Sequence, residues 1–174
     1  MNEVVLNALK TRRSIRKYKP EQIKKEELLA VLEAGTYAPT GMGKQNPIMV
    51  AVQNPEMVKK LSTLNAAVMN SKNDPFYGAP TVIVVFGNEE SGNCIQDASC
   101  VMDNLLNAAH AVGLGSCWIN RAKEVFESPE GKVIKEEWGI PENYVGVGNC
   151  ILGYIDGEAL EPKPRKEDYY KIIE

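Results

Sequence analysis

Histidines and closely spaced cysteines are scarce in this sequence. The chain has one histidine, His110, and its four cysteines are scattered without a C-x-x-C pair. Zinc sites usually combine Cys and His ligands at close spacing, so we expect no metal site. A G-x-x-x-x-G-K phosphate loop and a Ser-His-Asp order are also absent, and acid/base hydrolysis is therefore unsupported. We expect reduced, mostly structural thiols, because disulfides are rare in cytosolic proteins.

Long apolar runs and an export signal are absent as well. No run approaches the roughly 20 residues that a membrane helix needs. The opening residues, MNEVVLNALK, carry an acid and no signal-like segment. We therefore expect a cytoplasmic protein without membrane contact. The formal net charge of −3 argues against a general nucleic-acid binder, since that affinity comes from many spread Lys and Arg contacts to phosphates.

Repeats, low-complexity segments and Gly/Ser linkers are missing too, and 174 residues suit one hydrophobic core. We expect a single domain over residues 1–174. Apolar periodicity predicts helices at 2–11, 24–35, 55–68, 95–112 and 128–139, and strands at 48–53, 81–87, 116–120 and 145–155. This alternation indicates a three-layer α/β sandwich. Periodicity leaves open whether the strands run parallel or antiparallel.

One short stretch is strongly basic against this acidic background. TRRSIRKYKP, residues 11–20, holds five cations within eight positions: Arg12, Arg13, Arg16, Lys17 and Lys19. The planar fork of arginine suits phosphate, and the hydroxyl of Ser14 can add a neutral donor. The stretch is too short and too charged to be core. It is either a phosphate site or a solvated basic loop.

Two other segments are candidates for ligand contact. In the tail, PKPRK places Lys163 and Arg165 two positions apart, so that on an extended chain they point to the same side. Both ends of the chain would then grip one phosphate, unless the tail is a disordered end. The loop APTGMGKQNP has glycines that let the backbone approach a ligand, and Thr40, Lys44 and Gln45 offer donors and acceptors. A plain helix-to-strand connection is the alternative.

The segment GLGSCWINRA is not a dinucleotide fingerprint. Its glycines follow a helix instead of a strand, and a third glycine is missing, which excludes a Rossmann site. Trp118 is expected in the core. His110 lies inside the long helix without a carboxylate at i±3 or i±4, so we expect it to pack or to cap.

Four motifs follow one another along nearly the whole chain. They are R-R-S-x-R after a short first helix, APTGMGKQ before the first strand, AAHAVGLGSCWI after the central apolar strand, and K-x-R in the tail. Together they resemble the nitroreductase family of FMN-dependent oxidoreductases. The resemblance implies an α+β fold, a nitroreductase-like three-layer sandwich with a central mixed, largely antiparallel sheet flanked by helices, in an intertwined homodimer.

The resemblance also implies the residues that hold the cofactor. In the family, the first arginine and the serine of R-R-S-x-R meet the FMN phosphate and ribityl region, and the other arginines approach the ring. The P-[ST]-G loop crosses to the flavin of the other subunit, the stretch after G-L-G-x-x-W supplies backbone donors near flavin N5, and the tail cations reach the phosphate. The residues here that match these roles are Arg12 and Ser14 for the phosphate and ribityl region; Arg13 and Arg16 for the ring; Pro39, Thr40 and Gly41, with Gln45, for the loop; Trp118, Ile119, Asn120 and Arg121 for the donors near N5; and Lys163 and Arg165 for the tail cations.

The implied activity is reduction of nitroaromatics, quinones or similar small acceptors by NADH or NADPH in a ping-pong cycle. No catalytic side chain is expected, because the flavin carries the redox chemistry. A cation near the N1/C2 edge of the ring would stabilise the anionic reduced flavin, and our hypothesis assigns this role to Arg13.

Part of the loop departs from the family pattern. Gly43 stands where the family often has asparagine, and Asn46-Pro47 replaces P-W. A non-enzymatic FMN-binding or storage module is therefore the alternative. The sequence leaves open the acceptor, the choice between NADH and NADPH, the reactivity of Cys117, and which of Asn65, Asn70 and Asn73, if any, contacts the flavin ring.

Overall fold

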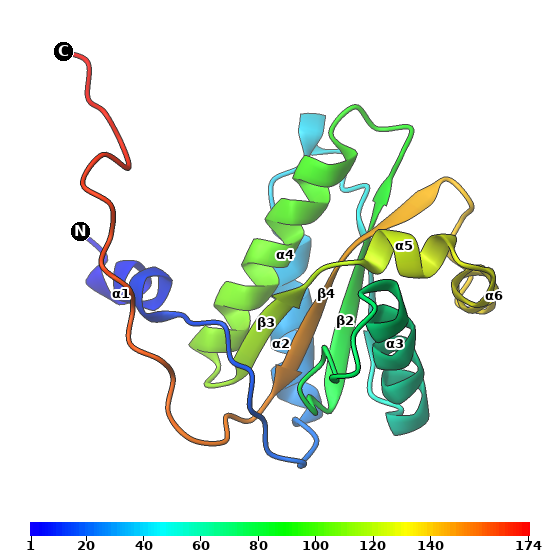
Figure 1. The fold of residues 1–174 in the computed structure, drawn as a ribbon. Coiled ribbons are helices and arrows are strands. Elements are labelled where there is room, and N and C mark those ends of the chain that lie inside the picture. Colours follow the sequence, from blue (N-terminus) through cyan, green and yellow to red (C-terminus); the bar gives the residue numbers. More distant parts are fainter.

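The structure, a computed structural model, describes all 174 residues. Its helices are α1 (Glu3–Thr11), α2 (Lys25–Thr36), α3 (Pro55–Val68), α4 (Cys94–Ala111), α5 (Ala122–Glu127) and α6 (Pro129–Glu137), with a short 3-10 turn, η1 (Gly41–Gly43). Its strands are β1 (Ile48–Val52), β2 (Thr81–Asn88), β3 (Gly115–Ile119) and β4 (Tyr144–Gly153), and Figure 1 labels the last three. None of the helices combines the length and apolar character that a membrane crossing requires.

The four strands form one sheet in the order β1-β2-β4-β3, and every neighbouring pair is antiparallel. One isolated parallel bridge joins Ser14 to Ser116 and adds the basic stretch to the outer side of β3. The sheet is therefore mixed and largely antiparallel, as the family resemblance implies, and the α+β fold class is confirmed.

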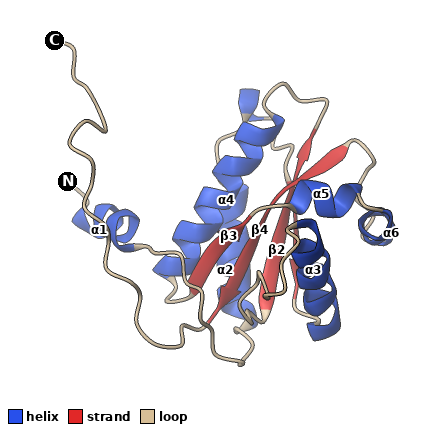
Figure 2. Ribbon diagram, viewed as in Figure 1, coloured by secondary structure: helices blue, strands red, loops and turns tan.

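Helices cover both faces of this sheet (Figure 2). On β2, Val82, Val84 and Phe86 belong to the core under α3, α5 and α6, whereas Ile83 and Val85 belong to the core under α2 and α4. Side chains of a strand alternate between faces, so a continuously apolar strand is expected to be buried on both. The prediction for residues 81–87 is confirmed.

Most predicted helices and strands lie within two residues of their observed bounds. α1 and α3 begin at asparagine caps, where the side chains of Asn2 and Asn54 accept hydrogen bonds from the N–H groups of Val5 and Met57. The helix predicted to run to Gly139 ends at Glu137, with Gly139 in the left-handed region after it. α5 was not predicted, since its six residues are too few for a periodic pattern.

The two ends of the chain bury almost nothing. α1 has no buried residue, and every residue from 157 to 174 is exposed. Both ends leave the sheet on the same side of the molecule, at the left of Figure 1. Their exposed apolar side chains include Val4, Val5, Leu9, Leu160, Tyr169, Tyr170, Ile172 and Ile173. Exposed apolar side chains gathered in this way are typical of surfaces that pack against another molecule.

Candidate functional site

The basic stretch is held against the sheet by its two apolar residues. Ile15 and Tyr18 are buried in the core under α3, α5 and α6. The backbone N–H of Ile15 donates to the carbonyl of Ser116 on β3 at 2.9 Å, and the Tyr18 hydroxyl donates to the carbonyl of Ile15 at 2.7 Å. These contacts fix the backbone of the stretch as an extra segment beside β3, with the arginines on its flanks.

The arginines of this stretch have no acidic partner. Arg12, Arg13 and Arg16 form no salt bridge, whereas the neighbouring Lys17 pairs with Asp156 at 2.8 Å. A guanidinium nitrogen of Arg12 and the Nε of Arg13 are shielded from solvent and have no hydrogen-bond partner. A buried unpaired donor typically costs about 1–3 kcal/mol, more when it is charged. An anion bound here would supply the missing acceptors.

The arginines at 13 and 16 differ in what they contact. One terminal nitrogen of Arg13 donates to the carbonyls of Lys10 and Arg12 at 2.8 and 2.6 Å, which turns the side chain toward the end of α1. Arg16 is exposed, and its shortest hydrogen bond is 3.5 Å long, to the carbonyl of Ser14. Arg16 is therefore the less constrained of the two.

A second group of donors lies where β3 ends. The backbone N–H groups of Asn120 and Arg121 donate to no acceptor in the chain. Arg121 has a φ of 77°, a left-handed conformation that is uncommon outside glycine. Trp118, expected in the core, is half-buried and packs against the core under α2 and α4, and its indole N–H is shielded from solvent without a partner.

Asn65 joins this group, which the sequence alone did not resolve. Asn70 and Asn73 are exposed, but Asn65 is only 1% exposed. Its Nδ2 donates to the carbonyl of Asn120 at 2.9 Å, and its Oδ1 is buried without a partner. The sequence holds one indication that singles out Asn65. It lies four residues after Leu61, which puts both residues on one face of the helix, and this is the face of α3 that the structure buries.

The loop of residues 39–45 is fastened to the start of α4. The N–H of Gly41 donates to Oδ1 of Asp97, a carboxylate that is 5% exposed, at 2.9 Å. The N–H of Gln45 donates to the hydroxyl of Thr40 at 2.9 Å. Met42 has a φ of 55° and projects into solvent. These two hydrogen bonds hold the loop in a defined conformation against α4, so it is more than a flexible connection between a helix and a strand.

This loop and Arg12 lie at opposite ends of α4. Asp97, which holds the loop, is in the first turn of the helix, whereas His110, in its last turn, contacts Thr11 beside Arg12. The helix rises about 20 Å between Asp97 and His110. Within one chain, the two predicted halves of the site therefore do not line a common pocket.

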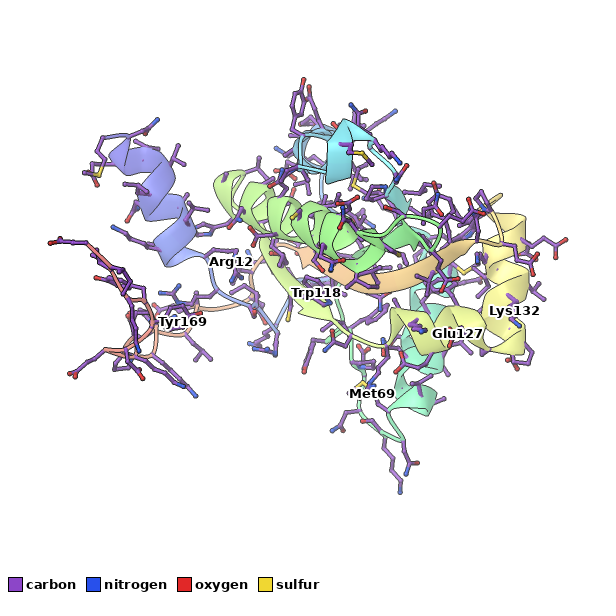
Figure 3. The ribbon with its side chains drawn as sticks, turned by 90° about the horizontal axis from the view of Figure 1, so that it is seen from above. Arg12, Met69, Trp118, Glu127, Lys132 and Tyr169 are labelled. Carbon is purple, nitrogen blue, oxygen red and sulfur yellow. The ribbon has the colours of Figure 1, made fainter.

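The tail does not reach the basic stretch within the chain either. Beyond Asp156 its only hydrogen bonds run from the Arg165 side chain to the carbonyl of Lys163. Figure 3 shows Tyr169 of the tail on the same side of the molecule as Arg12. The expected grip of both ends of one chain on a single phosphate is not seen in the isolated chain.

Two cavities of the chain lie away from these residues. One, of about 690 Å³, is bounded by α5, α6 and the start of β4, and it contains lysines and glutamates in similar numbers. The other, of about 830 Å³, lies between α3 and the segment that leads into β2. No predicted cofactor-binding residue lines either cavity. The basic stretch lies instead along the outer side of β3, and Asn120 and Arg121 lie at the end of that strand.

Cys117, whose reactivity the sequence left open, is buried in β3. Its Sγ lies 3.7 Å from the carbonyl of Trp118. A thiol that is shielded from solvent in this way is typical of a structural cysteine.

The fold and this sheet edge define a class of protein. It is an α+β sandwich that presents unpaired cations and backbone donors suited to a phosphate-bearing ligand. The model of the nitroreductase family matches residues 9–75 and 58–154. The chain therefore belongs to the nitroreductase family, and the resemblance drawn from the four motifs is confirmed.

Relatives and solved structures agree with this assignment. A relative from Archaeoglobus fulgidus, named for NADH dehydrogenase and NAD(P)H nitroreductase, is 32% identical over 176 residues, covering 96% of this chain and 90% of the relative. A crystal structure of a nitroreductase with bound FMN from Bacteroides fragilis is 32% identical with a TM-score of 0.91, and 100% of both chains is covered. A second nitroreductase with bound FMN, from Desulfitobacterium hafniense, is 25% identical with a TM-score of 0.89, again over 100% of both chains.

Proposed function

We propose that this protein is an FMN-dependent oxidoreductase. It takes electrons from NADH or NADPH and passes them to nitroaromatics, quinones or similar small acceptors in a ping-pong cycle. The observation that carries the proposal is the set of three arginines without acidic partners beside β3, together with the two unpaired backbone N–H groups at the end of that strand. The names of its relatives support the electron donor.

The residues present fit FMN. Arg12, with its shielded and unpaired guanidinium nitrogen, and the hydroxyl of Ser14 would bind the phosphate, which carries close to two negative charges near neutral pH. The N–H groups of Asn120 and Arg121 would donate toward the flavin ring. When bound, FMN supplies hydride chemistry at its N5 atom, so the chain needs no acid or base of its own.

We further propose that the working form is a homodimer with parts of each site drawn from both chains. α1 and the tail expose apolar side chains that a second copy would cover. The loop of residues 39–45 lies at the far end of α4 from Arg12, so it would contribute to the site of the partner. Lys163 and Arg165 would reach a phosphate in the same assembled form.

The visible spectrum of the protein loaded with FMN tests this function directly. Anaerobic NADH or NADPH should bleach the oxidised-flavin bands, and a quinone or nitroaromatic should restore them. Flavin that binds but does not bleach would indicate the storage module instead. A protein that takes up no flavin would contradict our account of the arginines.

The flavin reduction potential tests the hypothesis that Arg13 lies at the N1/C2 edge of the ring. Arg13→Ala should lower the potential of bound FMN, because the anionic reduced form loses a nearby cation. For a two-electron couple, each loss of 1.4 kcal/mol corresponds to about 30 mV, and we expect a shift of about that size.

Arg16→Ala is the matched variant for this measurement, since it removes the same charge from the less constrained side chain. A potential that changes in Arg16→Ala and not in Arg13→Ala would move the role to Arg16. Potentials equal to that of the unmodified protein in both variants would exclude either arginine from the ring edge.

The single histidine reports on the phosphate end of the site. Burial, with Arg12 and Arg13 nearby, lowers the pKa of His110. The Thr11 hydroxyl donates to the carbonyl of Asn7 at 2.8 Å, so it accepts from Nε2–H of His110, which lies 2.9 Å away. This bond persists when the ring is protonated, and the pKa of His110 therefore responds mainly to charge and burial.

We expect FMN to raise the pKa of His110, because the phosphate offsets the two arginines. In the protein without FMN, the pKa of His110 is lower in the folded chain than in the unfolded chain, where it has its ordinary value of about 6.5. As the pH falls through about 6.5, the unfolded chain therefore binds a proton at His110 before the folded chain does, and the free energy of unfolding decreases. With FMN bound, the two pKa values lie closer together and the decrease is smaller. Nuclear magnetic resonance of the one imidazole measures the titration directly. A pKa that FMN leaves unchanged would place the phosphate elsewhere.

A further inference from the structure

Two buried asparagines donate to consecutive backbone carbonyls at the end of β3. Asn149, on β4, is 3% exposed, and its Nδ2 donates to the carbonyl of Ile119 at 3.3 Å. Asn65, on α3, donates from Nδ2 to the carbonyl of Asn120 at 2.9 Å. Asn149 lies two positions before Ile151, which belongs to the core on the α3 side, so both amides approach from the same face of the sheet.

The direction of the carbonyls determines the direction of the N–H groups. In a planar trans peptide, the C=O and the N–H point in opposite directions. With the carbonyl of Ile119 held toward Asn149, the N–H of Asn120 points away from that side chain. With the carbonyl of Asn120 held toward Asn65, the N–H of Arg121 likewise points away from the α3 face. These are the two N–H groups that find no acceptor in the chain.

The backbone at this point is also strained. Arg121 is left-handed at a φ of 77°, a conformation that costs a residue with a side chain of order 1–3 kcal/mol and persists only where the surroundings enforce it. The Arg121 side chain is itself engaged, with Glu124 at 2.8 Å. The asparagine on the preceding carbonyl is one of the contacts that hold this peptide in place.

We propose that Asn149 and Asn65 are positioning residues for the flavin. By holding two consecutive carbonyls inward, they aim the N–H groups of Asn120 and Arg121 toward N5 of the bound ring. The proposal rests on the proposed function, because it requires FMN at this sheet edge. Asn149 is the cleaner case, since the Oδ1 of Asn65 is buried without a partner and is itself an acceptor that a ligand would meet directly.

Asn149→Leu in the FMN-loaded protein tests this role. The leucine has a similar size but no donor, so the carbonyl of Ile119 is released. We expect the nitrogen resonance of isotope-labelled FMN at N5 to shift toward that of flavin without a hydrogen bond there. Hydride transfer from NADH should slow about tenfold, the effect of one lost hydrogen bond, while FMN affinity changes less than about threefold.

Thr81→Val is the matched control. Thr81 is a fully buried polar residue of the same sheet, and its hydroxyl contacts Gln22 and Gln53 rather than the end of β3. This variant should lower the unfolding temperature without changing the N5 resonance or the rate. If Thr81→Val produces the same changes as Asn149→Leu, the effect is general destabilisation and the proposal is overturned.

Asn149→Val provides a second variant if the leucine form does not fold, since valine suits a strand and also lacks the amide donor. An N5 resonance and a rate equal to those of the unmodified protein overturn the positioning role, while the proposed function stands. Unmodified protein that takes up no FMN, or holds FMN that NADH does not reduce, would instead overturn the proposed function itself.

Discussion

Replacing Arg12 with alanine should lower the affinity for FMN roughly 100-fold, so that the purified protein is nearly colourless. Arg12 has a shielded guanidinium nitrogen without a partner, so this charged donor is available to an incoming phosphate. A hydrogen bond to a charged group contributes about 1.5–3 kcal/mol, and the loss of a bidentate contact removes two such hydrogen bonds at once. Quenching of FMN fluorescence on titration with protein measures the dissociation constant.

Lys19→Ala is the control for overall charge. It removes one cation from the same stretch, but Lys19 is exposed and its backbone N–H, which donates to the carbonyl of Tyr154, is retained. Its dissociation constant should stay within about threefold of that of the unmodified protein, as is usual for an exposed charge. Equal losses in Arg12→Ala and Lys19→Ala would mean that FMN responds only to net charge, and that Arg12 does not bind the phosphate.

Mixing two defective chains should restore flavin sites that neither has alone. Arg12→Ala damages the phosphate half of a site. Gly41→Pro damages the loop, because it removes the N–H that donates to Asp97 and fills the space beside Asn93. If each site takes Arg12 from one chain and the loop from the other, a mixed dimer has one site with both defects and one site with none.

The expected recovery of FMN binding can be measured after co-expression of the two variant chains in equal amounts. Random pairing makes half of the dimers mixed, so about a quarter of all sites should hold FMN with normal affinity. Each variant expressed alone, carried through the same procedure, gives the baseline. No recovery in dimers shown to be mixed would mean that the loop serves the site of its own chain.

The fold was largely predictable where burial alone decides the pattern. β2 is continuously apolar from Val82 to Phe86 and is buried on both faces, as expected. α3 is the contrasting case, because only Leu61 is fully buried among its apolar residues at helical spacing, Met57, Leu61, Leu64 and Val68. The structure buries Val58, Leu61, Ser62 and Asn65.

The physical reason lies in hydrogen bonds that no local pattern contains. The Ser62 hydroxyl donates to Asp74, and the Asn65 amide donates to the carbonyl of Asn120, so both polar side chains are buried with partners distant in sequence. The density of positive charge in the sequence was enough to single out the arginines of residues 12–16 as candidate cofactor-binding residues. Asn149 was missed because a single asparagine in an apolar strand gives no periodic signal, although its isolation among apolar residues was itself a clue.

In the proposed homodimer, the exposed ends of the chain would make FMN loading depend on protein concentration. α1 has no fully buried residue and the tail beyond Asp156 is exposed, so their contribution to a flavin site would exist only when two copies meet. Association of two copies follows mass action, and a dilute sample would therefore lose dimer and FMN together. Free FMN, by binding only the assembled form, would in turn favour pairing, and the amount of cofactor in a cell would help to determine how much of this protein is assembled.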